Sequence, residues 1–529
     1  MPDLGPFSTH VAPSGMVCSP DHLASASGVA ILRDGGSAAD AAVAASAVLA
    51  VVAPHLCGMG GDLMALVHDG DGPPAVLVSA GRAGSGADAE RLRAEGHRRM
   101  PFRGDIRSVP VPGCVDGWLA LHARYGRLGL DRVLADAVTL AGDGFPVSAL
   151  LAAALPLVEQ VPGASLPAAA DGHRVRAGDR WIRAGIAGAL RSILERGRAG
   201  FYEGVFGEGL LALGAGEYLE QDLRRPSAEW VDPLGLRVFG HDVFTVPPPS
   251  QGYLTLASAW IAEGLDLPDD PGDGRWVHLL VEAARQAGYD RPAVLHEHAD
   301  GPSLVREERL GPRRDAVHAD RAGTAAAPVA EGGTIFLAAA DAEGTGVSLM
   351  QSNAADFGAH LAEPTTGVFL HNRGLGFSLE PGHPAEYGPA RRPPSTLAPA
   401  VVTNPDGSLR ALVGSMGGDA QPQLVLQLLV RLLRHGELPG AAVGAARFVL
   451  ANHASRVGFD TWGDPAAIGV DVEDDAPPAW VDGLVERGQQ VRRRPPWLGF
   501  GHAQVITPVA GGWAGAADPR AGSGAAVGC

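Results

Sequence analysis

The stretch of sequence that decides the fold is Gly332-Gly333-Thr334-Ile335-Phe336-Leu337-Ala338-Ala339-Ala340-Asp341. Two glycines and a hydroxyl residue open an apolar run that contains β-branched and aromatic side chains. The turn Glu343-Gly344-Thr345-Gly346 then leads into a second short run, Val347 to Ser352. Two such runs joined by a glycine-containing turn predict a β-hairpin.

Thr334 has two interpretations. In the first it is an ordinary residue of a hairpin near the sheet edge of an α/β enzyme, which is what the local pattern alone favours. In the second the chain cuts itself between Gly333 and Thr334, and Thr334 becomes a new N-terminus. Its hydroxyl would then be a nucleophile and its freed amine the general base. The rest of the chain decides between them.

Length and composition narrow the class of protein. The chain has 529 residues, 46% hydrophobic and 19% charged, which predicts several domains or one large layered unit. A net charge of −17 disfavours a basic groove for nucleic acid and a polybasic membrane anchor. All 42 basic residues are arginine. The absence of lysine excludes Schiff-base catalysis, a pyridoxal-phosphate lysine and a P-loop lysine.

Neither a disulfide framework nor a metal site is expected. Cys18, Cys57, Cys114 and Cys529 are scattered and lack metal-ligand spacing. Cys57 and Cys114 lie in glycine-rich turns, so one of them could be a nucleophile, although small buried thiols are the simpler interpretation. The pair in His296-Glu297-His298 has no further ligands at a workable spacing. We expect no cofactor.

The sequence also predicts a soluble, cytoplasmic protein. The first residues, from Met1 to Pro6, lack the positive and apolar regions of a secretory signal. The longest apolar run, Ala41 to Ala53, is rich in alanine and too short to span a bilayer.

Local patterns predict an ordered series of helices and strands. Helices are expected over 20–32, over 41–52 with Ser37 as N-cap, from about 114 to 125, and over 130–141 and 276–287. Strands are expected over 63–68, 75–79, 242–246, 367–370, 399–403, 409–413 and 504–508. The Gly58 to Gly61 cluster precedes a strand and lacks dinucleotide-loop spacing, so a Rossmann fold is rejected. Together these elements suggest two sheets covered by helices.

Two other segments bear on Thr334. Asp300 to Glu331 is charged, then rich in Ala and Gly, which predicts a mobile linker before the nucleophile. Gly417 and Gly418 precede a helix whose Leu and Val residues from 424 to 432 share one face. Two successive amides at a helix start could hold an oxyanion, although the local pattern by itself favours a plain strand-to-helix turn.

These pieces together resemble the γ-glutamyltransferase family of N-terminal nucleophile hydrolases over nearly the whole chain. Besides the Thr334 hairpin and the Gly417-Gly418 pair, the motifs that carry the resemblance are Asp34-Gly35-Gly36-Ser37-Ala38-Ala39-Asp40, Pro54-His55 with Gly58-Met59-Gly60-Gly61, Val111-Pro112-Gly113-Cys114-Val115-Asp116-Gly117-Trp118, Asp143-Gly144-Phe145-Pro146-Val147, Val246-Pro247-Pro248-Pro249-Ser250, Asn372-Arg373-Gly374-Leu375-Gly376-Phe377-Ser378, Arg392-Pro393-Pro394-Ser395-Thr396-Leu397-Ala398-Pro399, and Trp513-Ala514-Gly515-Ala516-Ala517-Asp518-Pro519-Arg520.

The resemblance implies a four-layer αββα sandwich made as one precursor. Cleavage would give a large fragment, 1–333, and a small fragment, 334–529, which together form one αββα unit and an α/β heterodimer. Counting back from Asp341, which matches the family's aspartate in that strand, the nucleophile falls on Thr334. A supporting hydroxyl falls on Ser352. The resemblance places oxyanion-hole amides at Gly417 and Gly418.

The resemblance also indicates which residues would bind substrate. Hydroxyls that meet the substrate carboxylate fall on Ser395 and Thr396. The family's aspartate for the glutamyl amino group falls on Gly376, and its asparagine in the second hairpin strand falls on Ala354. Asn353 lies one place away and so faces the other side of the strand, but it stays among the candidate substrate-binding residues.

Two arginines modify this set. The acidic or amide residue after the Asn pair falls on Arg373, which would repel an ammonium group and attract an acid. The family's carboxylate-binding arginine matches Ala80, but Arg82 lies two residues on and could substitute for it. We therefore expect Arg82, Arg373, Ser395 and Thr396 to bind an acidic acyl group, with glutathione and other γ-glutamyl donors disfavoured.

Three hypotheses follow. The first is a self-processing hydrolase or acyltransferase that cleaves an amide through an acyl-enzyme on Thr334. Its substrate could be γ-glutamyl, another dicarboxylic monoamide, or a specialised-metabolite intermediate cut at a C–N or C–C bond. The second is an unprocessed, inactive homologue that acts as a binding module. The third is a cysteine enzyme that uses Cys57 or Cys114.

Overall fold

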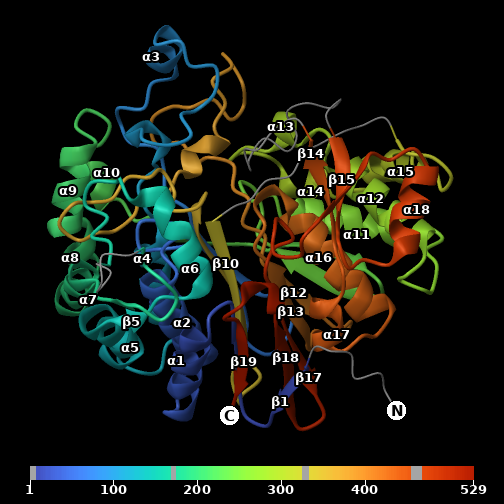
Figure 1. Cartoon of the computed structure of the whole chain (residues 1–529), viewed down its shortest axis with the longest axis horizontal. Coiled ribbons are helices and arrows are strands. Elements are labelled where there is room, and N and C mark those ends of the chain that lie inside the picture. Colours follow the sequence, from blue (N-terminus) through green and yellow to red (C-terminus); the bar gives the residue numbers. More distant parts are fainter. Residues whose placement is uncertain (1–7, 168–173, 324–332, 454–467) are drawn as a thin grey trace.

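The computed structural model describes residues 8–167, 174–323, 333–453 and 468–529, and Figure 1 shows two central sheets with helices on both outer sides. The last residues of the predicted linker, 324–331, and Gly332 lie outside these residues. The first sheet has seven strands in the order β1-β18-β17-β13-β12-β9-β8. Their bounds are His10–Ala12, Gly512–Ala517, Ala503–Val509, Leu409–Ser415, Ala400–Thr403, His241–Thr245 and Leu234–Val238.

The second sheet contains the hairpin that decides the fold. Its order is β19-β2-β10-β11-β3-β4-β7. The bounds are Ala525–Gly528, Met16–Ser19, Gly333–Ala340, Gly346–Ala354, Asp62–His68, Ala75–Ser79 and Glu229–Val231. The predicted hairpin is therefore confirmed as β10 and β11. It lies at the centre of the sheet and not at its edge.

Helices cover the outer face of each sheet. The second sheet carries α1 (His22–Arg33), α2 (Ala38–Val52), α4 (Cys114–Tyr125), α5 (Leu130–Asp143) and α7 (Ala184–Arg196), which share one apolar cluster with it. The first sheet carries α11 (Tyr253–Glu263), α12 (Gly274–Gly288) and α16 (Gln421–Leu429), again in one cluster. A third cluster fills the space between the sheets. The four-layer αββα sandwich is confirmed.

The hairpin sequence explains why β10 belongs in the middle of this sandwich. Side chains alternate between the two faces of a strand. Ile335 and Leu337 pack in the helix-facing cluster, whereas Phe336 and Ala338 pack in the cluster between the sheets. Because both faces are apolar, the strand is buried on both sides, as its continuous apolar run requires.

Asp341 joins the hairpin turn to α2. One carboxylate oxygen accepts hydrogen bonds from the Glu343 and Thr345 amides in the turn, at 3.1 and 3.0 Å. The other accepts from the Ala38 amide at 2.9 Å, at the start of α2, where a carboxylate also suits the helix dipole. Ser37 and Asp40 form the predicted cap of that helix as a capping box.

Most predicted elements occur where expected, but two predictions are wrong. The described part of the predicted linker contains α14 (Gly301–Leu304) and α15 (Glu307–Asp315). In α15, Leu310 is fully buried and Arg313 binds Asp290. The predicted strand over 367–370 forms only the bridge Ala362–Phe369, because the Glu363 carboxylate accepts from the backbone of Thr365 and Thr366 and turns the chain there.

The other described elements surround this core. The remaining strands are β14 (Phe448–Asn452), β15 (Ile468–Glu473) and β16 (Val491–Arg494) in a small sheet, and β5 (Phe145–Pro146) with β6 (Arg180–Trp181). The remaining helices are α3 (Ala89–Ala94), α6 (Ala149–Ala154), α8 (Arg198–Tyr202), α9 (Val205–Leu213), α10 (Glu220–Arg224), α13 (Arg291–Val294), α17 (Pro439–Gly444) and α18 (Pro478–Glu486).

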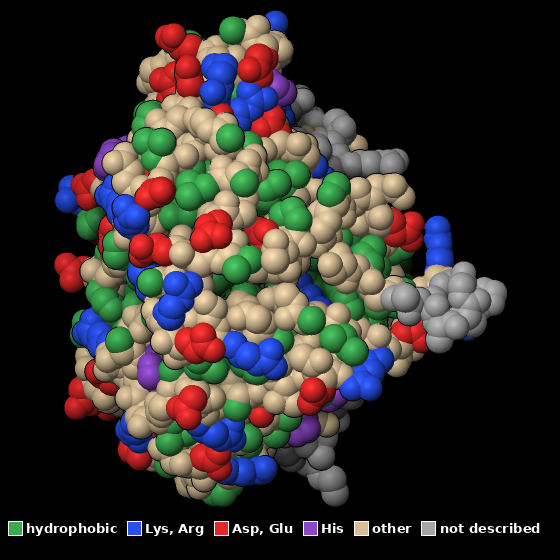
Figure 2. All heavy atoms as spheres, turned by 90° about the vertical axis from the view of Figure 1, so that its left-hand side faces the viewer, with side chains coloured by type: hydrophobic (Ala, Val, Ile, Leu, Met, Phe, Trp, Pro, Cys, Tyr) green, Lys and Arg blue, Asp and Glu red, His purple; other side chains and the backbone are tan. Residues whose placement is uncertain are grey.

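The surface over α5 and α7 to α10 is mixed in character. Figure 2 shows acidic, basic and apolar side chains interspersed on this face of the described chain. Within the described residues, we find no helix long and apolar enough to cross a bilayer.

Candidate active site around Thr334

Thr334 lies directly beside the peptide bond that it would attack. In the register of β10 and β11 it pairs with Ser352, and the two hydroxyl oxygens are 2.8 Å apart. The Ser352 hydroxyl also lies 2.8 Å from the Gly333 carbonyl oxygen, to which it donates a hydrogen bond. In the intact chain Thr334 and Ser352 are fully buried. The structure thus brings together the predicted nucleophile, the predicted supporting hydroxyl and the carbonyl of the predicted cleavage site.

Gly333 occupies a place that admits no side chain. A Cβ atom there would lie 2.5 Å from the Ala355 carbonyl oxygen and 2.9 Å from that of His55. Such distances are far below van der Waals contact, so a larger residue would displace the backbone. The backbone at the predicted cleavage site is therefore packed closely enough to require glycine at this position.

Arg373 lies in this centre, but with a different set of contacts from those expected. Its Nε donates to Asp62 Oδ2 at 2.7 Å, and its Nη2 lies 3.4 Å from the other Asp62 oxygen. Nη1 donates to Thr396 Oγ1 at 2.9 Å, and Nη2 donates to Ser352 Oγ at 2.9 Å. Asp62 and Arg373 are both buried. The arginine charge is thus compensated by a carboxylate that the sequence analysis did not single out.

These contacts determine the orientation of the Ser352 hydroxyl. A serine hydroxyl has one donor and two acceptor lone pairs. N–H groups of Arg373 and Ala354 donate to Ser352 Oγ, at 2.9 and 2.8 Å. With both lone pairs filled, the Ser352 proton points to Gly333 O or to Thr334 Oγ1. Ser352 therefore acts as a donor at the reacting groups.

Gly417 and Gly418 lie at the junction of β13 and α16, with φ angles of +144° and +54°. Such angles favour glycine. The N–H groups of both residues are without a hydrogen-bond partner among the described residues. Gln251 Nε2 donates to the carbonyl oxygens of Gly418 and Thr396, each at 3.0 Å. Hydrogen bonds therefore connect the glycine pair, through Gln251 and Thr396, to Arg373 and Ser352.

Ser395 lies next to this chain of bonds. It is fully buried, and its Oγ accepts from the Leu397 amide at 3.3 Å. Its backbone carbonyl accepts from the Gln251 amide at 2.9 Å. Ser395 thus helps to position Gln251, and its part in binding a substrate carboxylate stays a prediction.

Arg82 and Asn353 lie apart from the other candidates. Arg82 pairs with Glu297 at 2.9 Å and with Glu229 at 3.5 Å. Asn353 is fully buried, and its Nδ2 donates to the Pro54 carbonyl at 3.0 Å. It points into the Pro54 turn, which agrees with the expectation that it faces away from the Ala354 side. The structure does not bring Arg82 or Asn353 to the reaction centre.

A cavity of about 550 Å³ opens next to these residues. Ala354, Arg373, Gly376 and Thr396 line its inner part. The charged side chains on its wall are the arginines 98, 99, 291 and 373, with Glu380 and Asp419. A cavity of this size can hold a small organic substrate.

Gly376 cannot carry the missing carboxylate without a backbone rearrangement. A Cβ atom at this position would overlap the Pro394 carbonyl oxygen. The Arg392–Pro394 segment is itself held in place, because Arg392 donates to the Ala80 carbonyl at 2.9 Å and pairs with Glu229 at 2.7 Å. An aspartate here, where the resemblance places the family's residue for the amino group, would therefore require the backbone to move.

The cysteines and histidines do not form a competing centre. Cys57 and Cys114 are fully buried, and burial raises the pKa of both thiols above the ordinary value. A thiol of raised pKa is a poor nucleophile at neutral pH. Within the part of the chain that is described, no group of three or more His, Cys, Asp or Glu residues could hold a metal ion.

Comparison with known proteins identifies the family of this chain. The sequence profile described as Gamma-glutamyltranspeptidase matches residues 24–528. The chain belongs to the gamma-glutamyltranspeptidase family. It is 35% identical to "Oxamate amidohydrolase proenzyme" of Klebsiella pneumoniae, over 98% of this chain and 99% of that protein. It is also 35% identical to "Glutathione hydrolase-like YwrD proenzyme" of Bacillus subtilis, over 97% and 98% of the two chains.

The solved structures give the same result for this member of the gamma-glutamyltranspeptidase family. A cephalosporin acylase from Bacillus halodurans aligns with a TM-score of 0.88 and 31% identity, over 100% of this chain and 98% of that one. Family membership makes this protein an enzyme of the hydrolase and acyltransferase type.

Sequence reasoning missed two residues of this family member's site. Asp62 directly follows the glycine-rich turn Gly58 to Gly61. The signal available in the sequence was an acidic residue between that turn and the strand expected over 63–68. Gln251 follows the Pro247 to Ser250 motif, and no pattern in the sequence marked it.

Proposed function

We propose that this protein is a self-processing amide hydrolase whose nucleophile is Thr334, with 1–333 and 334–529 as its two fragments. The observation that carries the proposal is the contact of Thr334 Oγ1 with Ser352 Oγ at 2.8 Å, while Ser352 also reaches the Gly333 carbonyl. Family relatives named as proenzymes support the two-fragment form.

Self-cleavage follows from this arrangement in two steps. Thr334 Oγ attacks the Gly333 carbonyl carbon, and the Thr334 nitrogen leaves with the hydroxyl proton, which converts the amide into an ester. The hydrogen bond from Ser352 to Gly333 O stabilises the negative charge that develops on this oxygen. Water then hydrolyses the ester, so that Gly333 acquires a carboxylate and Thr334 a free amine.

Turnover uses the same hydroxyl with the new amine as its base. The amine takes the Thr334 proton as Oγ attacks the substrate carbonyl, and it returns that proton to the departing nitrogen. Amides of Gly417 and Gly418 hold the oxyanion; losing one such donor typically lowers kcat by about 10²–10³-fold. Water then resolves the acyl ester and regenerates Thr334.

We propose an acidic acyl group, in particular a dicarboxylic monoamide without an α-amino group, as the substrate class. Four arginines and two acidic residues line the cavity, and Asp62 lies behind Arg373. Arg98 and Arg99 are exposed at this cavity and are suited to meet a carboxylate. The name of the Klebsiella relative supports the class, since oxamate is itself a dicarboxylic monoamide.

Gel analysis and mass spectrometry test the proposal together. Purified protein should separate into two fragments under denaturing conditions, and Thr334→Ala should remain one band. Incubation with oxamate, glutaryl-p-nitroanilide and γ-glutamyl-p-nitroanilide should leave an acyl adduct on Thr334 for the first two. A single intact band with no turnover would favour the inactive binding homologue, and a dominant γ-glutamyl adduct would overturn the substrate class.

A further inference from the structure

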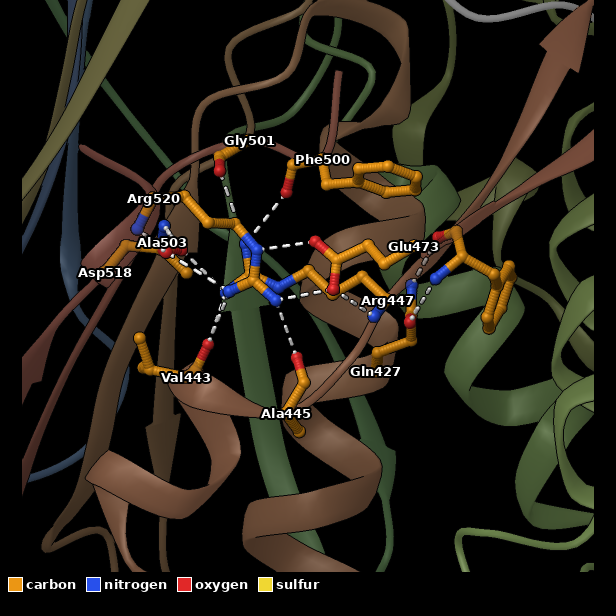
Figure 3. A network of polar contacts seen from close by, with 11 residues as sticks. Gln427, Val443, Ala445, Arg447, Glu473, Phe500, Gly501, Ala503, Asp518 and Arg520 are labelled. Atoms are coloured by element: carbon orange, nitrogen blue, oxygen red, sulfur yellow. Dashed lines mark hydrogen bonds and ion pairs between the residues drawn. The ribbon is translucent and has the colours of Figure 1, made fainter. Parts of the chain in front are cut away.

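A buried ionic network in 334–529 contacts the segment that packs against the glycine pair Gly417-Gly418, which we assign to the oxyanion hole. Figure 3 shows Arg447 and Arg520 converging on Glu473 and Asp518. Arg447 Nη2 lies 2.7 Å from Asp518 Oδ2. Arg520 donates to both Glu473 oxygens at 2.6 Å. Both side chains are almost fully buried, at 3% and 6% exposure.

The two arginines bind different backbone segments. Arg520 donates to the carbonyls of Val443 and Ala445, at the end of α17 and just beyond it. Arg447 also reaches Val443, at 2.7 Å, but its Nη1 donates to the Phe500 carbonyl at 2.8 Å and to the Gly501 carbonyl at 3.4 Å. Arg447 is thus the member of the pair that holds the segment preceding β17.

That segment supports the loop that contains Gly417. The His502 carbonyl accepts from the Met416 amide at 3.2 Å. Gly501 has φ of +69°, and a Cβ atom on it would overlap the Met416 carbonyl oxygen. Backbone therefore packs directly on backbone one residue before Gly417.

A small apolar cluster makes the same connection. Phe500 is fully buried with Ala420 and Leu424 from the start of α16, and with Val449 and Ala451 from β14. Residue 500 is thus fixed by an arginine through its carbonyl and by the α16 end through its ring. Any shift of this segment would be transmitted to the Gly417-Gly418 loop.

We propose that Arg447 is a positioning residue that fixes the amides of Gly417 and Gly418 through Phe500, Gly501 and His502. Its role in turnover rests on the proposed function. The direction of an oxyanion donor matters strongly, and a displacement of about 1 Å can lower a rate about 10²-fold. Arg520 lies in the same network and shares the Val443 carbonyl, but it donates to Ala445 and not to Phe500 or Gly501, so it should lack this role.

Arg447→Met and Arg520→Met form the matched pair that tests this inference. Each removes one buried guanidinium that pairs with Asp518; the Arg520 guanidinium also pairs with Glu473. Hydrogen exchange of the peptide 414–420 should become faster in Arg447→Met and stay unchanged in Arg520→Met. With glutaryl-p-nitroanilide, kcat should fall about ten-fold or more in Arg447→Met, with KM within about two-fold of wild type. Equal effects of the two variants, or no change at 414–420 in Arg447→Met, would overturn the inference.

A second pair serves if Arg447→Met does not fold. Gly501→Ala introduces a methyl group against Met416, whereas Gly488→Ala has a similar φ of +83° with no neighbouring atom within 4 Å. Only Gly501→Ala should speed exchange at 414–420. Because hydrogen exchange needs no turnover, a failure of the hydrolase proposal is distinguishable from a failure of this one.

Discussion

Replacement of Arg373 tests whether this residue acts through Ser352 or binds substrate directly. The sequence interpretation assigned it to an acidic acyl group, but its four hydrogen bonds go to Asp62, Thr396 and Ser352. Arg373→Met alone would leave the buried Asp62 carboxylate unpaired, which typically costs about 3–5 kcal/mol of folding stability. The informative variant is therefore Arg373→Met combined with Asp62→Asn.

The expected loss of rate follows from one hydrogen bond. Without Arg373, a lone pair of Ser352 Oγ is free, and its proton is no longer restricted to Gly333 O or Thr334 Oγ1. A hydrogen bond to a charged group contributes about 1.5–3 kcal/mol, so self-cleavage and kcat should each fall by about 10- to 150-fold. KM should stay within about three-fold of wild type, because Arg373 is already neutralised by Asp62.

The assay compares the rate of fragment formation, kcat and KM in wild type, Arg373→Met, the double variant and Arg392→Met. Arg392 is a suitable control because it is also buried and paired with a carboxylate, Glu229, but it donates to the carbonyls of Ala80 and Ser227 instead of to Ser352. The double variant should recover thermal stability without recovering the rates. The reasoning would be refuted if the double variant formed fragments at the wild-type rate. A KM raised ten-fold or more at unchanged kcat would also refute it.

Four further outcomes are expected. Ser352→Ala should slow self-cleavage by about 10-fold or more, measured as band conversion on gels, since the donor to the scissile carbonyl is lost. Gly333→Ala should also slow it and lower the melting temperature, because its methyl group has no room. Gly376→Asp should not create γ-glutamyl-p-nitroanilide hydrolysis, since the new Cβ overlaps the Pro394 carbonyl; rapid hydrolysis by this variant would show that the backbone adapts. Burial lowers the pKa of His502 to about 4, so the folded chain keeps it neutral where the unfolded chain, with a pKa near 6.5, becomes protonated. Stability should therefore fall as pH decreases from 6.5 towards 4, by about 2 kcal/mol for this group at pH 5, and His502→Gln should lose less stability than wild type between pH 7.5 and 5 in urea titrations.

The sequence was sufficient for the parts of the fold that depend on neighbouring residues. The apolar run 334–340 predicts a strand, and the Ser37–Asp40 cap predicts the start of α2; both are local effects that the structure confirms. The position of a strand within its sheet depends instead on residues far away in the sequence. The hairpin was expected near an edge, but β2 and β3 pair on either side of it.

Local pattern alone favours an ordinary hairpin at Thr334 and a plain strand-to-helix turn at Gly417 and Gly418. The resemblance to the γ-glutamyltransferase family assigns these residues their chemistry, and those roles stay predictions. The Asp62–Arg373 pair joins residues 311 positions apart, so nothing in the sequence showed that the Arg373 charge would be compensated. The same limit explains why the sequence did not predict α15. Arg309 and Arg313 are typical of a solvated segment in the sequence, and only the structure shows that both pair with Asp290.

Compensation of Arg373 by Asp62 changes the argument about substrate. An uncompensated arginine beside the nucleophile would itself select acids, whereas the paired one is neutral as a unit and serves Ser352. The selection of an acidic acyl group that we propose would then depend on the outer arginines of the cavity. Among these, Arg98 is exposed and has no carboxylate partner among the described residues. Arg98→Ala should therefore raise KM for glutaryl-p-nitroanilide by several-fold while leaving self-cleavage unchanged, since cleavage involves no bound acid. If KM for glutaryl-p-nitroanilide also stayed at its wild-type value, the substrate carboxylate would have to be bound deeper in the cavity, by Ser395 and Thr396.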